Sequence, residues 1–413
     1  MCGGRRAGTG VAAALVALAV GGALVAAPAA AETDAMSEAH VERVLEGRAP
    51  LRSPRAVDLE VPAPISRASR ISARGVVIGE TSGDDGFHRG FRWEAGTAVI
   101  LPDDGFGSRA VDVNVHGQVA GSITTADGSS RTVIWEPDGT VVDLTSPPEL
   151  VSVWDIDDSG RVAVNWHDPA TGLPHAAVWQ DGRLTLLGDL GGGTSQVASS
   201  NALNVRGDVT GTAVTVDDRR RAFLWRDGVM TALPAPDTAD AYASGGITAH
   251  GDVIGLVSDF TGGRSGPVVW ARGGMTFFRD RVDVADVNDR GGVAGRAPVL
   301  DDGRALGYVG DHRGGLRLAG LGGRSGMANA LNEAEVPVGW AGRPGDQELH
   351  PVAWLRGVPV PLGEELSGTA VRGGAATDIN DRGQVVGALN AITGPDPFDH
   401  TPRAVLWELA PRS

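Results

Sequence analysis

A basic side chain stands four residues before a tryptophan at six places in this sequence. The six are Arg89, Arg131, His175, Arg221, His350 and Arg403. Guanidinium and imidazolium groups bind carboxylates and phosphates, so six of them on one face could hold an anionic ligand such as an acidic sugar. The alternative interpretation is structural, with each base entering a strand and pairing with an acid of a neighbouring unit of the fold.

Two further places depart from the repeated pattern described below, and both contain tryptophan. Trp166 and His167 follow Val164, where the pattern has glycine, and Trp340 directly follows Gly339. Functional sites often break the local rules of a fold, and an indole ring can stack on a sugar ring. These three residues are therefore candidate ligand contacts, and packing between neighbouring units is the alternative.

The sequence contains none of the common catalytic or cofactor-binding motifs that we sought. It has no Gly-x-Ser-x-Gly elbow, no His-Glu-x-x-His, and no lysine for a phosphate-binding loop. Cys2 is its one cysteine, which excludes a zinc site built from cysteines. The stretch that starts at Asp155 begins like an EF-hand loop, but its twelfth position is Trp166 rather than glutamate. We therefore predict no catalytic residue, no cofactor and no metal site.

The charge of the chain narrows the choice of partner. The formal net charge is −15, and arginine is the basic residue throughout because lysine is absent. An acidic chain without basic runs is a poor partner for nucleic acids and for anionic membranes. The ordinary consequence of such a charge is solubility.

The first 31 residues have the layout of a secretory signal peptide. Arg5 and Arg6 precede an almost wholly apolar run at 11–27, and three alanines at 29–31 offer a cleavage site. A membrane anchor is the alternative, although a run of about 17 residues is marginal for spanning a bilayer. We expect a secreted, extracellular protein without stable membrane insertion after cleavage. Residues 32–54 are expected to form a leader of low order, with a short helix as an option at 34–46.

One pattern recurs from about residue 55 to the end of the chain. A polar residue is followed three positions later by glycine, and a second glycine comes four positions after the first. The polar residues are Ser72, Asn114, Asp157, Asn204, Thr248, Asn288, Asn332 and Asn380. Glu335 replaces the first glycine in the seventh unit, and Val164 replaces the second glycine in the third. The period of about 44 residues is typical of repeat architectures.

Each unit supplies about four short stretches that are typical of β-strands. They combine β-branched and aromatic residues and are bounded by glycine, asparagine and aspartate. Four strands in this length match one propeller blade, and a single blade buries its two faces only when neighbours stack against it. The sequence predicts an all-β protein with a single β-propeller at 55–413, made of eight four-stranded blades, with seven as the alternative. The recurring tryptophans suit contacts between blades.

The two ends of the repeat region complement each other. The eighth unit reaches Trp407 without a fourth strand, and Ala56–Leu59 resembles Val141–Leu144, the fourth strand of the second unit. We predict that the N-terminal segment completes the last C-terminal blade, because this closes the ring and removes exposed sheet edges.

Three segments resemble the HAF-repeat family of bacterial extracellular proteins. They are Asp378–Gly387, Leu173–Trp179 and Leu187–Ser195. The family has His-Ala-Phe before its aromatic residue, and this chain has degenerate versions at 175–177, 221–223 and 403–405. The resemblance covers roughly residues 65–407 and implies a propeller-like repeat architecture rather than a particular reaction.

These observations favour a secreted, non-catalytic repeat protein that acts as a binding module. Its partner would be a carbohydrate or an envelope protein, and we expect a monomer. One alternative is an extracellular propeller enzyme such as a polysaccharide lyase or a glycoside hydrolase, the latter needing two carboxylates about 5–9 Å apart. A structural component of a surface layer is the other alternative.

Overall fold

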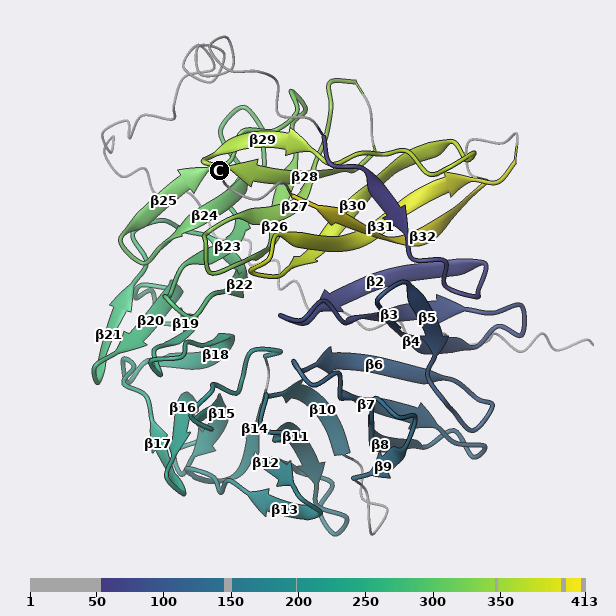
Figure 1. Ribbon diagram of the computed structural model, residues 1–413. Coiled ribbons are helices and arrows are strands. Elements are labelled where there is room, and N and C mark those ends of the chain that lie inside the picture. Colours follow the sequence, from purple (N-terminus) through teal and green to yellow (C-terminus); the bar gives the residue numbers. More distant parts are fainter. Residues whose placement is uncertain (1–52, 145–150, 198, 346–347, 395–398, 410–413) are drawn as a thin grey trace, which may run out of the picture.

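The fold consists of antiparallel sheets arranged around a common axis. The computed structural model describes residues 53–144, 151–197, 199–345, 348–394 and 399–409. Within these ranges it has 32 strands, grouped as eight four-stranded sheets, and no helix. The predicted all-β propeller with eight blades is therefore confirmed, and the seven-bladed alternative is wrong (Figure 1).

The strands of each blade run outward from the axis in chain order, with the eighth blade as the exception. The first four blades are β2 (Ile65–Ile71), β3 (Val77–Ser82), β4 (His88–Glu94) and β5 (Thr97–Ile100); β6 (Ser108–Val113), β7 (Val119–Thr124), β8 (Ser130–Trp135) and β9 (Val141–Asp143); β10 (Val151–Ile156), β11 (Val162–His167), β12 (Pro174–Gln180) and β13 (Arg183–Leu186); and β14 (Gly191–Gln196), β15 (Val209–Thr215), β16 (Arg220–Arg226) and β17 (Val229–Ala232). The other four are β18 (Ala239–Ile247), β19 (Val253–Asp259), β20 (Gly266–Ala271) and β21 (Gly274–Phe277); β22 (Asp283–Val287), β23 (Val293–Arg296), β24 (Gly307–Asp311) and β25 (Gly314–Arg317); β26 (Gly326–Leu331), β27 (Pro337–Ala341), β28 (His350–Leu355) and β29 (Val358–Pro361); and β30 (Val371–Ile379), β31 (Gln384–Ile392), β32 (His400–Glu408) and β1 (Ala56–Asp58).

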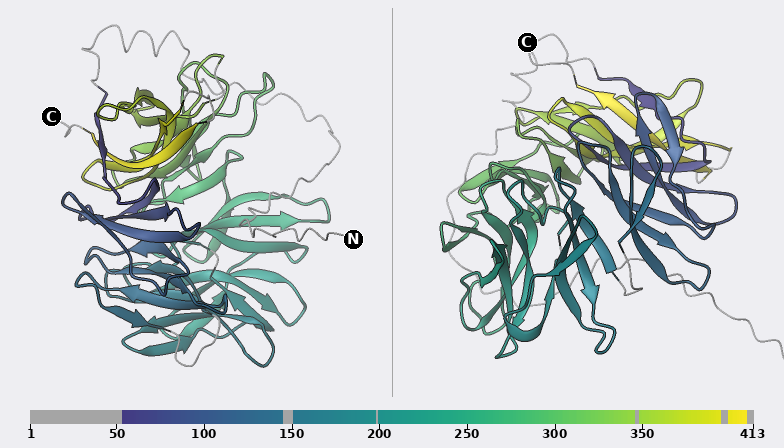
Figure 2. Two further views of the ribbon diagram at one scale, coloured as in Figure 1. Left: turned by 90° about the vertical axis from the view of Figure 1, so that its right-hand side faces the viewer. Right: turned by 60° about the horizontal axis from the view of Figure 1, so that its bottom comes forward.

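The ring is closed by β1, which lies antiparallel to β32 (Figures 1 and 2). Ala56 pairs with Trp407 and Asp58 with Val405, and the next residue, Leu59, donates its backbone N–H to Ala404 O at 3.0 Å. The predicted completion of the last blade by the N-terminal segment is thus confirmed. The predicted signal peptide at 1–31 and the predicted helix at 34–46 lie outside the described residues.

The polar residue of the repeat forms two kinds of hydrogen bond, illustrated by Asn288. Its Oδ1 accepts the backbone N–H groups of Arg290 and Gly292, which shapes the turn between β22 and β23. Its Nδ2 donates to the backbone oxygen of Asn332, the equivalent residue of the next blade, at 3.2 Å. All five asparagines at this position make the bond to the next blade: Asn114 to Asp157, Asn204 to Thr248, Asn288 to Asn332, Asn332 to Asn380, and Asn380 to Ser72.

The two glycines of the repeat answer different steric needs. The first adopts a positive φ in the turn, and Glu335, which replaces it in the seventh unit, has a φ of 55°. The second lies against a bulge of the innermost strand. A Cβ at Gly79 would come within 2.0 Å of Arg67 O and 2.5 Å of the Phe91 ring, so no side chain fits there.

The interior of seven blades contains one fully buried large ring. In four blades this ring is a tryptophan: Trp135, Trp270, Trp354 and Trp407. In three blades it is a phenylalanine or tyrosine that lies two residues earlier on the third strand: Phe91, Phe223 and Tyr308. All seven repeat tryptophans pack on hydrophobic clusters shared by two neighbouring blades, as predicted, but Trp93, Trp179 and Trp225 are only half-buried there. In the third blade, Val164 faces Ala177 across the sheet and fills the space instead.

The asparagine bond between blades predicts a measurable loss of stability. Asn288→Ala removes two turn bonds and the bond to Asn332 O, which then keeps only the Glu335 N–H as a donor, so the free energy of unfolding should fall by about 1–3 kcal/mol. Urea denaturation monitored by tryptophan fluorescence measures it. Thr248→Ala is the control, because Thr248 Oγ1 accepts only the turn N–H of Asp252 and should cost less. Equal losses in the two variants would contradict a role for the bond between blades.

Candidate functional site

The six predicted basic residues all lie in the third strand of a blade, and their contacts are with other protein groups. Arg89 forms ion pairs with Asp85 at 2.7 Å and Asp103 at 3.0 Å. Arg131 does the same with Asp104 at 3.1 Å and Asp143 at 2.7 Å. These acids belong to the same blade or to the segment connecting the first and second blades, so both guanidinium charges are compensated locally.

The other four basic residues are also engaged. His350 Nδ1 lies 3.0 Å from Glu364, and Arg403 lies 3.2 Å from Asp58 of the closing strand. Arg221 donates to the backbone oxygen of Ala239 at 2.6 Å. His175 faces Trp166 across the sheet, with ring centroids 5.7 Å apart. Four of the six bases thus lie beside acids of their own blade or of a connecting segment, and both the structural interpretation and the ring for an anionic ligand stay predictions.

The three candidate aromatic and imidazole residues are divided between two blades. Trp166 and His167 end β11 of the third blade, whereas Trp340 lies in β27 of the seventh, opposite Met327 and Pro351. All three are half-buried. The structure thus brings Trp166 together with His175 but keeps Trp340 apart from both.

A cluster of charged residues lies on the propeller axis, and we did not predict it from the sequence. Its members stand two residues before the polar turn residue of their units: Arg70, Asp112, Asp155, Asp286 and Asp378. We call these five residues the channel cluster. Arg70 Nε lies 3.7 Å from Asp112 Oδ1. Although burial disfavours its charge, carboxylates from four different blades raise the pKa of Arg70, which places the cluster where these blades converge.

Each channel carboxylate also accepts a backbone N–H of the next blade, from the innermost strand in three cases and from the segment between β14 and β15 in the case of Asp155. The donors are Ile156 for Asp112, Leu203 for Asp155, Leu331 for Asp286 and Ile71 for Asp378, at 2.8–3.1 Å. Asn201 of the fourth blade reaches across to Asp286 of the sixth at 2.9 Å. Gly246 of the fifth blade allows this, because a Cβ there would lie 2.7 Å from Asn201 O.

Burial shifts the titration of three channel carboxyls. It raises the pKa of Asp378 to about 6, against the opposing effect of Arg70. Burial, together with the nearby Asp112 carboxylate, raises the pKa of Asp155 well above its usual range. Burial also raises the pKa of Asp286. The channel cluster therefore takes up protons in mildly acidic solution, where ordinary aspartates are ionised.

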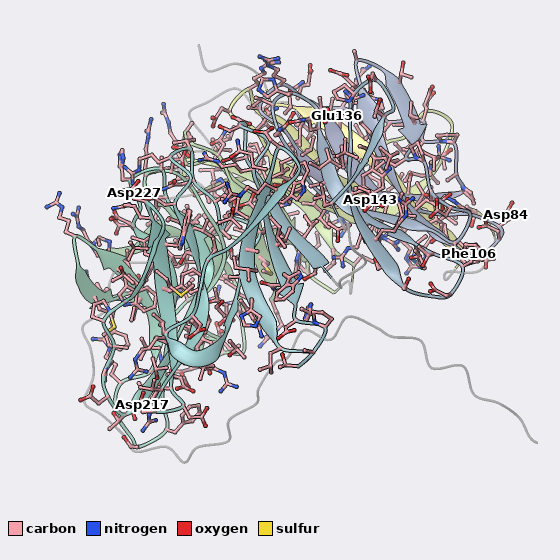
Figure 3. All side chains as sticks on the ribbon, turned by 90° about the horizontal axis from the view of Figure 1, so that it is seen from below. Asp84, Phe106, Glu136, Asp143, Asp217 and Asp227 are labelled. Atoms are coloured by element: carbon pink, nitrogen blue, oxygen red, sulfur yellow. The ribbon has the colours of Figure 1, made fainter. Side chains whose placement is uncertain are left out.

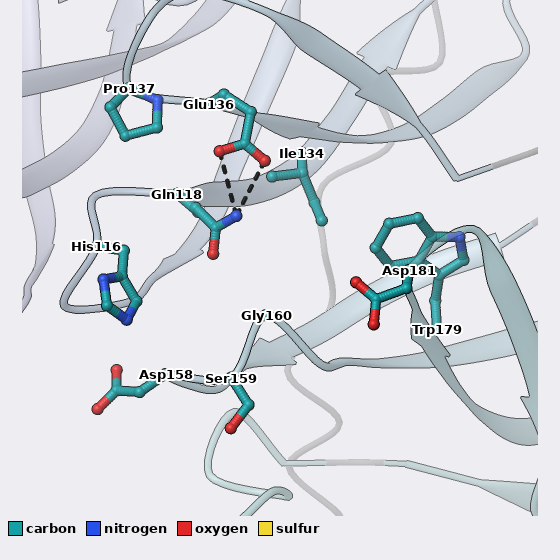
Figure 4. A pocket seen from close by; sticks show the side chains of 10 residues that line it. All are labelled: His116, Gln118, Ile134, Glu136, Pro137, Asp158, Ser159, Gly160, Trp179 and Asp181. Atoms are coloured by element: carbon teal, nitrogen blue, oxygen red, sulfur yellow. Dashed lines mark hydrogen bonds between the residues drawn. The ribbon is translucent and has the colours of Figure 1, made fainter.

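A groove of about 430 Å³ lies between the second and third blades (Figure 4). Turns of both blades line it: His116, Gln118, Ile134, Glu136 and Pro137 from the second blade, and Asp158, Ser159, Gly160, Trp179 and Asp181 from the third. It opens at the end of the sheets opposite to the predicted basic residues. Figure 3 shows these two ends, with Asp217 and Asp227 at opposite ends of the fourth blade.

The polar groups of the groove are held in place by other protein groups. Gln118 Nε2 donates to both carboxylate oxygens of Glu136, at 2.9 and 3.2 Å, while its own Oε1 accepts from Asn114 at 2.7 Å. Asp158 Oδ1 accepts the backbone N–H of Val115 across the blade boundary at 3.1 Å. The groove thus presents two carboxylates fixed by hydrogen bonds, those of Glu136 and Asp158, and a third, that of Asp181, beside the indole ring of Trp179.

The half-buried state of Trp179 follows from the replacement of glycine by Val164. In the second blade a Cβ at the equivalent Gly121 would lie 2.7 Å from the Trp135 ring, so ring and side chain exclude each other. Val164 is fully buried in that place in the third blade, and Trp179 instead packs partly on the cluster between the second and third blades. The replacement of glycine by Val164 could have pointed to Trp179. From the sequence we instead took it as a reason to select Trp166 and His167.

Among the described residues, no three histidine, cysteine, aspartate or glutamate side chains are grouped closely enough to hold a metal ion. Polar side chains gather in the groove and in the channel cluster. Of these, the groove combines an accessible volume with an aromatic surface.

Comparisons with known proteins complete the description. No protein-family model and no curated protein matches this chain. Solved structures that are similar include an acylaminoacyl peptidase of Pyrococcus horikoshii (11% identity, 82% of this chain and 60% of that one, TM-score 0.46). A second is a puromycin-hydrolyzing peptidase of Mycobacterium tuberculosis (14% identity, 88% of this chain and 55% of that one, TM-score 0.43). A third is a gluconolactonase of Xanthomonas campestris (14% identity, 87% of this chain and 91% of that one, TM-score 0.33). The chain spans 60% or less of the length of these two peptidases.

The channel cluster predicts that the protein is more stable at pH 5 than at pH 8. A carboxyl with a raised pKa stays protonated in the folded state at pH values where the unfolded residue is ionised, so the free energy of unfolding falls as pH rises from about 4 through 6 and above. Asp155→Asn removes one such group and should raise the stability at pH 8 while flattening this slope. Urea denaturation at both pH values measures the effect.

The matched control for this prediction is Asp227→Asn, a change of an exposed aspartate in an outer turn. It should leave the slope unchanged. A wild-type protein that becomes more stable between pH 5 and pH 8, or an Asp155→Asn variant with an unaltered slope, would show that the channel cluster does not titrate in this range.

Proposed function

We propose that this protein is a non-catalytic binding module that holds a neutral glycan in the groove between its second and third blades. The observation that carries the proposal is the placement of Trp179, a half-buried indole, in a groove of about 430 Å³ lined by Gln118, Glu136, Asp158 and Asp181. This size falls within the range of small-molecule sites.

The chemistry of the groove suits the hydroxyl groups and the apolar face of a sugar. Carboxylate and amide oxygens accept hydrogen bonds from hydroxyls, and the indole offers a flat apolar surface with a polar edge. The bonds between Gln118 and Glu136 and between Val115 and Asp158 fix these acceptors before a ligand arrives, which lowers the entropic cost of binding.

The charge of the groove favours a neutral glycan over an acidic one. Glu136, Asp158 and Asp181 line it without any lysine or arginine. An anionic sugar would meet three carboxylates at short range, which costs free energy because like charges repel. The groove therefore suits a neutral glycan better than the acidic sugar that the predicted ring of basic residues suggested.

The proposed place of action is outside the cytoplasm. Support comes from the sequence, in which Arg5 and Arg6 precede an apolar run and a small-residue cleavage site. The resemblance to extracellular HAF-repeat proteins points the same way and remains part of the proposal, as does the monomeric state.

A glycan array followed by fluorescence titration tests the proposed function. Neutral oligosaccharides should be retained, and Trp179→Ala should weaken the binding of the best-retained one by at least about tenfold, as expected for a central aromatic contact. The control is Trp225→Ala, because Trp225 is half-buried at the same repeat position of the fourth blade.

Three results would overturn or redirect the proposal. Retention of no neutral glycan would contradict it, as would an equal loss of affinity in Trp179→Ala and Trp225→Ala. Release of shorter sugars from the retained glycan would instead favour the glycoside hydrolase alternative.

A further inference from the structure

We infer a second ligand site, for a small oxyanion, between the fifth and sixth blades. A pocket of about 340 Å³ lies there. Its lining comes from residues 263–267, which are the turn before β20 and the start of that strand, and from Phe277 at the end of β21 with Phe278, Asp280 and Arg281 of the segment that follows. Two arginines belong to it, Arg264 and Arg281. The site is separate from the groove of the proposed function, and it lies at the other end of the sheets.

The pocket occupies the place where the repeat has lost a side chain. Six blades carry arginine or histidine four residues before the tryptophan, and the fifth blade carries Gly266 there instead. In the first blade this base pairs with Asp103. The corresponding acid of the fifth blade is Asp280, which lacks that base and accepts hydrogen bonds from the Tyr308 hydroxyl and the Gly315 N–H, each at 3.0 Å. A Cβ at Gly266 would meet no atom within 4 Å, so the space is open.

Arg264 is held in a fixed position within this pocket. Its guanidinium carbon lies 4.3 Å from the centre of the Phe277 ring, and one Nη donates to Phe278 O at 3.0 Å. Stacking on an aromatic ring leaves the edges of the guanidinium free to donate further hydrogen bonds. Arg264 is therefore oriented in advance for a second acceptor.

Arg281 faces the same pocket from the connecting segment, where it donates to Ser265 O at 3.4 Å. Neither arginine forms an ion pair with an acid of the part of the chain that the structure describes. Two guanidinium groups at the rim of one pocket, facing a single carboxylate, bind an oxyanion better than a cation.

The walls of the pocket add a preference for a ligand with an apolar face. Phe277 is half-buried, Phe278 is 3% exposed, and Pro267 completes this side of the pocket. A ring that bears a carboxylate, such as a uronic acid, matches both features. Free inorganic phosphate shares the oxyanion chemistry and would use the two arginines alone.

Isothermal titration of the intact protein with glucuronate, glucose and inorganic phosphate tests this inference. Glucuronate should bind, and its affinity should fall at least about tenfold in Arg264→Ala and in Arg281→Ala and also fall with added salt. Arg219→Ala is the matched control, because Arg219 lies in the equivalent turn of the fourth blade and should leave the affinity unchanged. Circular dichroism of each variant checks that the fold is retained.

The outcomes separate the two anion sources and the two sites. Phosphate binding that needs both arginines, without glucuronate binding, keeps the oxyanion site and assigns it to phosphate. Equal binding of glucose and glucuronate, no binding of either anion, or binding that survives the loss of both arginines would overturn the inference. Trp179→Ala should leave glucuronate binding intact, so failure of this site and failure of the groove are distinguishable.

Discussion

A side-chain amide that reaches from one blade to the next underlies the geometry of this propeller. In five of the eight units the turn asparagine uses its oxygen to shape its own turn and its nitrogen to bind the backbone of the following blade. One residue therefore sets both the hairpin and its distance from the neighbour. Where the residue is Ser72, Asp157 or Thr248, the amide donor is absent and other groups supply the link. Between the first and second blades, Arg70 pairs with Asp112. Between the third and fourth blades, Asp155 accepts the Leu203 N–H, and between the fifth and sixth, Asp289 accepts the Ala249 N–H.

The links near the axis have an electrostatic cost. Four aspartates converge with one arginine, and burial raises the pKa of three of them. Their carboxylates are retained because each satisfies a backbone N–H of the next blade that would otherwise be buried without a partner. The same groups that register the innermost strands thus make the ring sensitive to pH. The four aspartates thus have a structural role, and their side chains occupy the axis, where many propellers have a central channel.

Both ligand sites proposed for this protein arise where the repeat is broken. The groove exists because Val164 fills the interior place of an aromatic ring, which leaves Trp179 half-buried beside fixed carboxylates. The pocket of Arg264 and Arg281 exists because Gly266 replaces the base that other blades pair with an acid. In a blade that follows the repeat, the aromatic ring is buried and the basic side chain contacts other protein groups. Where the repeat is broken, such a group becomes accessible to a ligand.

The repeated pattern was enough to predict eight blades, the strand that closes the ring, and the turns with their glycines, although seven blades stood as an alternative. These features depend on backbone conformation and on spacing along the chain, and the turn pattern recurs in eight units with small variations. The spacing of the six basic residues before the recurring tryptophan was visible in the sequence, but whether acids lay beside them depended on the packing of adjoining segments. By contrast, the convergence of Arg70 and the four aspartates on the axis and the position of Trp179 in a groove became visible only once the blades were packed together. Such contacts join residues of different blades, and they depend on which side chain fills a shared space, which spacing along one chain does not specify.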